Sequence, residues 1–135
     1  MKKGIYFLIS ALLALTDMLL KEIFERGGKV RIIKNTGFAG SFMHKRPKLV
    51  MLVSTIFTGF IAVYIALSGE NGRITTIKKI GWSTVLGGAL SNSIDRIRKH
   101  YVVDYIPIGK YVYNISDFFI YIGALTAGIA ELFNP

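Results

Sequence analysis

The sequence contains no cysteine and only two histidines. Without cysteine the chain has no disulfide, no thiolate nucleophile and no cysteine-ligated metal. The two histidines, His44 and His100, are far apart in the sequence, and no group of carboxylates lies near either one at the spacing of metal ligands. We therefore expect no metal and no other cofactor.

Acidic side chains are also scarce, because eight Asp and Glu residues face seventeen Lys and Arg residues and the net charge is +9. The basic residues are spread through several segments without interleaved aromatic residues, so nucleic acid is not an expected partner. Hydrophobic residues make up 52% of the 135 residues, and the mean hydropathy is +0.47. This exceeds what a soluble domain needs for its core and indicates a membrane protein. Anionic lipid headgroups are then the expected partner of the excess positive charge.

Long apolar stretches predict the fold class, an all-α integral membrane protein with four transmembrane helices in one domain over residues 1–135. The connections are a long one (Lys21 to Arg46), a short one (Ser68 to Lys79) and a loop (Arg98 to Tyr113). In the first, the alternating segment Lys29 to Lys34 predicts a short strand on the membrane surface. The four stretches are Gly4 to Leu20, Pro47 to Leu67, Ile80 to about Ile97, and Ile115 to Phe133.

The distribution of basic residues conflicts with a cytoplasmic N-terminus. We interpret the N-terminal apolar run as a retained span, not a signal peptide, because no small-x-small site follows it and Asp17 comes next. With the N-terminus inside, cytoplasmic segments hold only five of the seventeen basic residues: Lys2, Lys3, Arg73, Lys78 and Lys79. The other twelve lie at the opposite end, so the positive-inside rule favours both termini outside.

Two groups of polar residues interrupt the apolar stretches. Asp17 and Lys21 are four residues apart and can pair on one helix face, either to close a helix end or to fix a site. Asn92, Asp95 and Arg96 have three- and four-residue spacing, which predicts a hydrogen-bonded cluster on one side of the third helix. The preceding Gly-Gly-Ala-x-Ser segment favours close helix packing.

Two further acids, Asp104 and Asp117, lie near the end of the chain. Asp104 has apolar neighbours, which would bring it to the membrane surface close to the start of the fourth helix. Asn114 and Asp117 flank that start, where capping and the helix dipole are one explanation. If the two carboxylates lie within about 4 Å, their repulsion is about 4 kcal/mol at an effective dielectric of about 20. One then stays protonated near neutral pH, as in an aspartic peptidase.

Five segments, in this order, are similar to the motifs of a known family. They are Asp17-x-x-x-Lys21, Asn35-Thr36-Gly37-Phe38-Ala39, Gly87-Gly88-Ala89-Leu90-Ser91-Asn92-Ser93-Ile94-Asp95-Arg96, Val102-Val103-Asp104-Tyr105 and Tyr113-Asn114-Ile115-Ser116-Asp117. The chain resembles bacterial lipoprotein signal peptidase, signal peptidase II. The segments cover nearly the whole chain, and the last three are highly specific.

The resemblance implies an aspartic endopeptidase of the bacterial plasma membrane that removes the signal peptide of a prolipoprotein just before a diacylglyceryl-modified cysteine. It implies a small extracytoplasmic β element after the first of four helices, cytoplasmic termini, an active site near the outer leaflet, no metal or cofactor, and sensitivity to globomycin. Lipid-modified prolipoprotein and membrane lipid are the expected partners of a monomer. The implied site consists of catalytic Asp104 and Asp117, with Asn35, Gly37, Asn92, Asp95, Arg96, Asn114, Asp17 and Lys21 binding substrate or supporting the pair.

The chain departs from the family pattern at a few positions. Ser91 replaces a glycine, Ser116 stands where alanine is common, Phe118 replaces a small residue, and Gly40 stands where an aromatic residue is usual. The stretch before Asn35 is short, which predicts a reduced extracytoplasmic sheet. Two alternatives follow: a paralogous peptidase with a narrower substrate range, or a non-catalytic membrane protein that binds lipid or a partner chain. A proton-coupled transporter is disfavoured because the acids cluster at helix ends.

Overall fold

A computed structural model describes residues 2–69 and 72–133, so the ends of the predicted 1–135 domain and two residues of the second connection lie outside the described residues. The elements are α1 (Lys3–Gly27), β1 (Ile33–Asn35), the 3₁₀ turn η1 (Ala39–Ser41), α2 (Pro47–Leu67), α3 (Arg73–Lys99), β2 (Val102–Asp104), β3 (Ile106–Ile108), β4 (Tyr111–Tyr113) and α4 (Ile115–Phe133). The prediction of four helices with a small β element after the first is therefore confirmed for the described residues, and the pair β3–β4 is present in addition.

The helix boundaries were predicted correctly for the two most apolar helices, α2 and α4. The first helix is longer than predicted, because it continues past Leu20 to Gly27 and ends at Gly28, which has φ +62°. The third begins at Arg73, before Ile80. The additional turns carry charged residues, such as the Glu22–Arg26 ion pair. Their low hydropathy led to the prediction of a loop.

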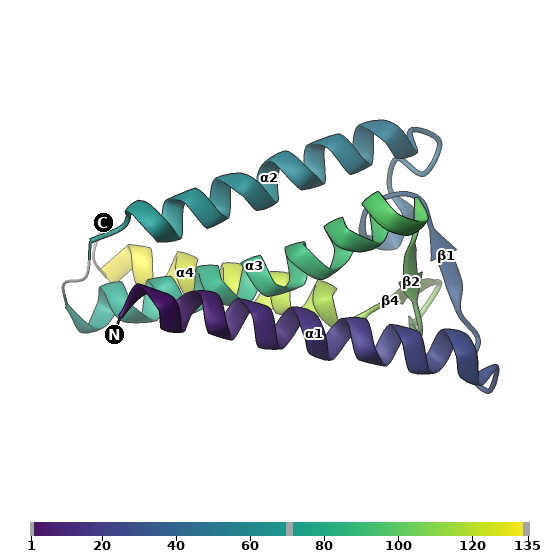
Figure 1. Cartoon of the computed structure of the whole chain (residues 1–135), viewed down its shortest axis with the longest axis horizontal. Helices are drawn as coiled ribbons and strands as arrows, with labels where there is room; N and C mark the ends of the chain where they lie inside the picture. Colours follow the sequence, from purple (N-terminus) through teal and green to yellow (C-terminus); the bar gives the residue numbers. More distant parts are fainter. Residues whose placement is uncertain (1, 70–71, 134–135) are drawn as a thin grey trace.

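Helix α3 is the centre of the bundle and contacts each of the other three helices (Figure 1). Its glycines permit this packing, as the sequence predicted. A Cβ on Gly87 would lie 2.8 Å from the Leu13 side chain of α1, and one on Gly88 would lie 2.4 Å from the Ser116 carbonyl oxygen of α4. Small residues thus bring α1 and α4 into backbone-level contact with opposite sides of α3.

The outer surface of the bundle is apolar. Large hydrophobic side chains are exposed along α1, α2 and α4, among them Leu12, Leu19, Phe60, Ile122 and Leu125. Five charged residues of α1 and α3, by contrast, are buried in the bundle: Asp17, Lys21, Lys79, Asp95 and Arg96. Among the described helices, α2 and α4 are long and apolar enough to cross a membrane by composition alone. This inside-out distribution is that of a membrane protein.

Short strands close the end of the bundle opposite the start of α1 (Figure 1). Strand β1 pairs antiparallel with β2, with Ile33 opposite Asp104, and β3 pairs antiparallel with β4. The strand predicted over Lys29 to Lys34 is therefore displaced to Ile33–Asn35, and the loop predicted from Arg98 to Tyr113 contains three strands. Local pattern missed them because each strand has three residues and β1 finds its partner far along the chain.

Candidate active site

Asp104 is the last residue of β2 and is 2% exposed. Both of its carboxylate oxygens accept hydrogen bonds from side-chain amides. The Asn35 Nδ2 donates to Oδ2 at 2.9 Å, and the Asn114 Nδ2 donates to Oδ1 at 2.8 Å. The β1–β2 pairing sets Ile33 opposite Asp104 and Asn35 opposite Val102, so the Asn35 side chain reaches Asp104 diagonally across the short sheet.

Asp117 lies in the first turn of α4 and is 7% exposed. Its backbone N–H donates to the Asn114 Oδ1 at 3.0 Å, and its own Oδ2 accepts the Asn114 backbone N–H at 3.1 Å. These reciprocal bonds form a capping box, so the capping explanation is correct. Asn114 nevertheless also donates to Asp104, and thus bridges the two carboxylates.

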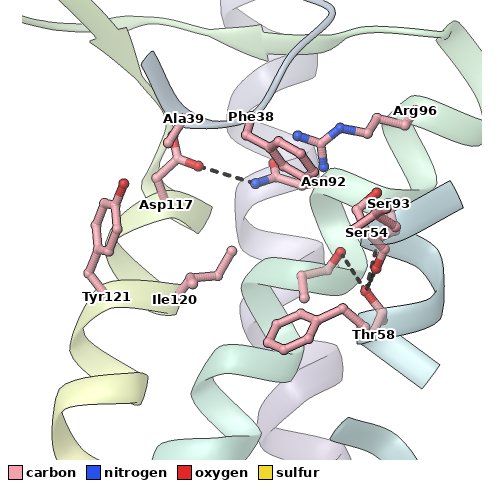
Figure 2. Close-up of a pocket in the computed structure, with 13 residues that line it drawn as sticks. Phe38, Ala39, Ser54, Thr58, Asn92, Ser93, Arg96, Asp117, Ile120 and Tyr121 are labelled. Atoms are coloured by element: carbon pink, nitrogen blue, oxygen red, sulfur yellow. Dashed lines mark hydrogen bonds between the residues drawn. The ribbon is translucent and has the colours of Figure 1, made fainter. Parts of the chain in front are cut away.

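A cavity of about 270 Å³ opens beside Asp117 between α2, α3 and α4. Figure 2 shows Asp117 and Asn92 pointing toward one another, and the Asn92 Nδ2 donates to the Asp117 Oδ1 at 3.3 Å. Apart from this polar end the walls are mostly apolar, which suits an extended peptide with hydrophobic side chains. The lining residues are Phe38, Ala39, Val53, Ser54, Phe57, Thr58, Ala89, Asn92, Ser93, Arg96, Asp117, Ile120 and Tyr121.

The loop after β1 is held against the cavity by Arg96 and Gly37. The Arg96 Nη2 donates to the Gly37 carbonyl oxygen at 3.0 Å, and the Arg96 guanidinium lies 5.6 Å from the centre of the Phe38 ring. The Gly37 N–H in turn donates to the Asn35 Oδ1 at 2.8 Å, so Asn35 links the turn to Asp104.

Replacing Gly37 by alanine is expected to lower cleavage activity by about tenfold or more, because misplacement of positioning groups is costly. A Cβ at this position would lie 2.3 Å from the Phe42 carbonyl oxygen and 2.9 Å from the His44 backbone nitrogen, so the loop must shift. The measurement is kcat/KM together with helical content by circular dichroism. Gly69→Ala is the matched control, since a Cβ there meets nothing within 4 Å; equal activities of the two variants would contradict the prediction.

Asp17 and Lys21 do more than close a helix end. Asp17 is fully buried and Lys21 is 1% exposed, with 2.6 Å between the Lys21 Nζ and the Asp17 Oδ2. The same Nζ lies 3.1 Å from the Asp95 Oδ2 and donates to the Asn92 Oδ1 at 2.9 Å. Lys21 thereby fixes the orientation of the Asn92 amide whose nitrogen faces Asp117. The predicted Asp17–Lys21 pair is therefore present. The predicted cluster of Asn92, Asp95 and Arg96 is present only in part, because Lys21 links Asn92 and Asp95 whereas Arg96 donates to Gly37.

Three residues of this cluster were not predicted as part of the site. Ser91 and Ser116 both donate to the Asp17 Oδ2, at 2.5 Å and 2.7 Å, and the Tyr105 hydroxyl donates to the Asp17 Oδ1 at 3.1 Å. Both serines were visible as departures from the family pattern. Their shared acceptor, however, lies on another helix, so the sequence alone could not connect them.

Burial raises the pKa of Asp104 from 3.8 to about 6, and the negative charge of Asp117 contributes to the rise. The hydrogen bonds from Asn35 and Asn114 act in the opposite direction because they stabilise the ionised form. Asp104 is therefore able to hold a proton at a pH where an exposed aspartate has lost it. A buried pair of acids bridged by an amide, beside an apolar cavity in a helical bundle, defines a membrane aspartic peptidase.

Comparison with known proteins identifies the family. Residues 7–133 match the Peptidase_A8 family, described as signal peptidase (SPase) II. The chain therefore belongs to the signal peptidase II family, and it is a lipoprotein signal peptidase, an aspartic peptidase that cleaves prolipoprotein signal peptides. This membership rules out the non-catalytic alternative.

Individual relatives agree with this assignment. The chain is 33% identical to the lipoprotein signal peptidase of Shouchella clausii (90% of this chain, 83% of the relative) and 32% identical to that of Geobacillus thermodenitrificans (95% and 86%). The match to the enzyme of Caldicellulosiruptor bescii is 37% identical but spans 69% of this chain and 59% of that relative. A bacterial membrane enzyme solved by the in meso method at 2.3 Å shares the fold, with a TM-score of 0.82, 20% identity and coverage of 97% of this chain and 89% of that one.

Proposed function

We propose that the enzyme hydrolyses the peptide bond that precedes a diacylglyceryl-modified cysteine, with Asp104 and Asp117 as the catalytic pair. The observation that carries the proposal is the bridge made by Asn114, which contacts both carboxylates and so links Asp104 to Asp117, the acid that lines the apolar cavity. The signal peptide's hydrophobic residues fit the apolar walls, and its diacylglyceryl chains fit the lipid outside the bundle.

In this mechanism the two acids share one proton. The ionised carboxylate removes a proton from water as the water oxygen attacks the scissile carbonyl carbon. The protonated carboxylic acid donates a hydrogen bond to the carbonyl oxygen and stabilises the charge that develops there. A proton then passes to the leaving amine and the C–N bond breaks, which releases the signal peptide and the lipid-modified product. Asn35, Asn92 and Asn114 hold the carboxylates in place.

The proposed topology has all four helices crossing the membrane, both termini in the cytoplasm and the strands at the outer leaflet. Support comes from the apolar stripes on α1, α2 and α4, which surround the charged residues of α3 and screen them from lipid. The proposed active unit is a monomer, because one chain supplies all of the site contacts described above. Membrane lipid then surrounds the helical bundle on all sides.

Cleavage by purified protein in lipid vesicles tests this function. Diacylglyceryl-modified prolipoprotein and the same precursor without the lipid serve as substrates, and mass spectrometry of the products locates the cut. We expect a cut immediately before the modified cysteine and at least about a hundredfold preference for the modified precursor. Equal cleavage of both precursors would reject the lipid requirement. A panel of prolipoproteins with different residues around the cysteine tests the narrower-substrate alternative.

The pH dependence of cleavage should follow Asp104. With its pKa at about 6, the pair keeps its shared proton below this pH and loses it above, along with the acid that polarises the carbonyl. We therefore expect kcat/KM to fall as the pH rises through about 6, by up to tenfold per pH unit. Initial rates at constant ionic strength, with folding followed by circular dichroism, provide the measurement. A constant rate up to about pH 8 in folded protein would contradict it.

A further inference from the structure

A second cavity, of about 160 Å³, lies at the strand end of the bundle and shares only Arg96 with the active-site cavity. Its walls come from the loop after β1, the first turns of α2 and the end of α3. No acidic side chain lines it. The lining residues are Thr36, Pro47, Lys48, Met51, Arg96 and His100.

Arg96 lines both this cavity and the active-site cavity, and one of its donors is unused. The side chain is 7% exposed, and one of its nitrogens, Nη2, donates to the Gly37 carbonyl oxygen. The Nε is buried and has no hydrogen-bond partner among the described residues. An unpaired guanidinium N–H in a buried position is costly, so Arg96 favours an additional acceptor beside it.

The first turn of α2 adds more positive potential. Pro47 occupies the first turn, and the backbone N–H groups of Lys48 and Leu49 have no acceptor within the helix. No side chain caps this helix start. The exposed Lys48 ammonium has no ion-pair partner within residues 2–69 and 72–133. Together with the helix dipole, these donors favour an anion.

The depth of the cavity identifies the source of the anion. The apolar span of α2 begins at Pro47, on the cavity wall, so the cavity lies where the hydrocarbon ends and phospholipid headgroups begin. Twelve of the seventeen basic residues belong to the strand end of the bundle. With both termini in the cytoplasm, the positive-inside rule does not explain this excess. An anionic lipid surface attracts such an excess.

We infer that this cavity binds the phosphate group of an anionic phospholipid, with Arg96, Lys48 and the start of α2 as donors. Met51 and Pro47 offer an apolar edge for the glycerol and the first methylene groups. The diacylglyceryl group of the proposed substrate carries no phosphate, so this lipid is separate from the substrate. A lipid bound here would brace Arg96, which holds the Gly37 loop over the active site.

Thermal unfolding of the purified protein in neutral detergent measures this binding without any cleavage step, so it stands apart from the proposed peptidase chemistry. The probes are dihexanoyl phosphatidylglycerol, dihexanoyl phosphatidylcholine and sodium phosphate, each titrated to obtain an apparent Kd from the shift in the unfolding midpoint. We expect saturable stabilisation by phosphatidylglycerol at a Kd about tenfold or more below that of either other probe. Equal affinity for phosphatidylcholine would overturn the requirement for an anionic lipid.

Two charge-reversal variants separate a site from general surface charge. Lys48→Glu should raise the Kd for phosphatidylglycerol by about tenfold or more, whereas Lys29→Glu, an exposed lysine of the same end outside the cavity, should change it less than about twofold. Lys48→Arg should retain binding, which guards against a folding defect in Lys48→Glu. Equal weakening by Lys48→Glu and Lys29→Glu would overturn the site. Phosphate binding as tight as lipid binding, with the same dependence on Lys48, would overturn the lipid as the occupant.

Discussion

Asp104→Asn and Asp117→Asn should each lower kcat by about 10²- to 10⁴-fold while KM stays close to the wild-type value. Asparagine preserves the shape of the side chain but neither takes a proton from water nor donates a carboxylic proton to the carbonyl oxygen. The cavity walls that receive the peptide are unchanged, so substrate binding should persist. Steady-state cleavage of a diacylglyceryl-modified prolipoprotein, followed by mass spectrometry, provides both constants.

The stability of these variants distinguishes a catalytic role from a structural one. Burial disfavours the charged form of Asp104, which favours a neutral asparagine there, but asparagine has one acceptor oxygen and loses one of the bonds from Asn35 and Asn114. Because these effects oppose one another, the unfolding midpoint should change little. Glu131→Gln is the matched control, since it removes a 55% exposed acid at the other end of α4, where Glu131 forms an ion pair with Lys78. It should cleave at the wild-type rate. Near-normal kcat in either aspartate variant would exclude that residue from the chemistry.

Asn114 links helix formation to catalysis. As the residue before α4 it accepts the Asp117 N–H with its side-chain oxygen and donates its own backbone N–H to the Asp117 carboxylate, and its side-chain nitrogen donates to Asp104. The same contacts that start the helix therefore set the relative position of the two acids. A capping box at an active site thus serves two purposes, and the sequence pattern of Asn114 and Asp117 is compatible with either one.

The sequence predicted the fold best where composition alone determines an element. Helices α2 and α4 are apolar throughout and begin at Pro47 and just after Asn114, so both ends could be predicted. The end of α1 and the start of α3 could not, because the additional turns carry charged residues that hydropathy does not assign to a span. The strand β1 was displaced by a few residues and β2 was missed, because both depend on pairing between distant segments, as in Ile33 with Asp104. The adjacent strands β3 and β4 were missed because each has only three residues.

For the site, residue types and helical spacing predicted which polar residues lie close together within one helix. The pairing of Asn92 with both Lys21 and Asp117 was not predictable, because it depends on how α1 and α4 pack against α3. In the sequence, Ser91 and Ser116 are only departures from the family pattern. The structure shows that both donate hydrogen bonds to Asp17. Their roles follow from tertiary contacts, which one sequence taken alone does not reveal.

Lys21→Met should destabilise the folded protein by about 3–5 kcal/mol, because it leaves the buried carboxylates of Asp17 and Asp95 without their cation. Methionine has a similar length and fills the same space, so the loss reflects charge and not a cavity. The substitution also removes the donor that orients Asn92 toward Asp117. We therefore expect lower kcat in the fraction that stays folded. The free energy of unfolding in mixed detergent micelles provides the measurement.

The Glu22–Arg26 pair of the same helix is the control for this prediction. It has the same four-residue spacing, but its side chains are 44% and 81% exposed. Solvent screens an exposed pair, so Glu22→Gln should change the free energy of unfolding by less than about 0.5 kcal/mol. The double variant Lys21→Met with Asp17→Asn should recover part of the loss, since it removes one of the uncompensated carboxylates. A loss for Lys21→Met as small as that for Glu22→Gln would mean that the buried ion cluster does not stabilise the bundle.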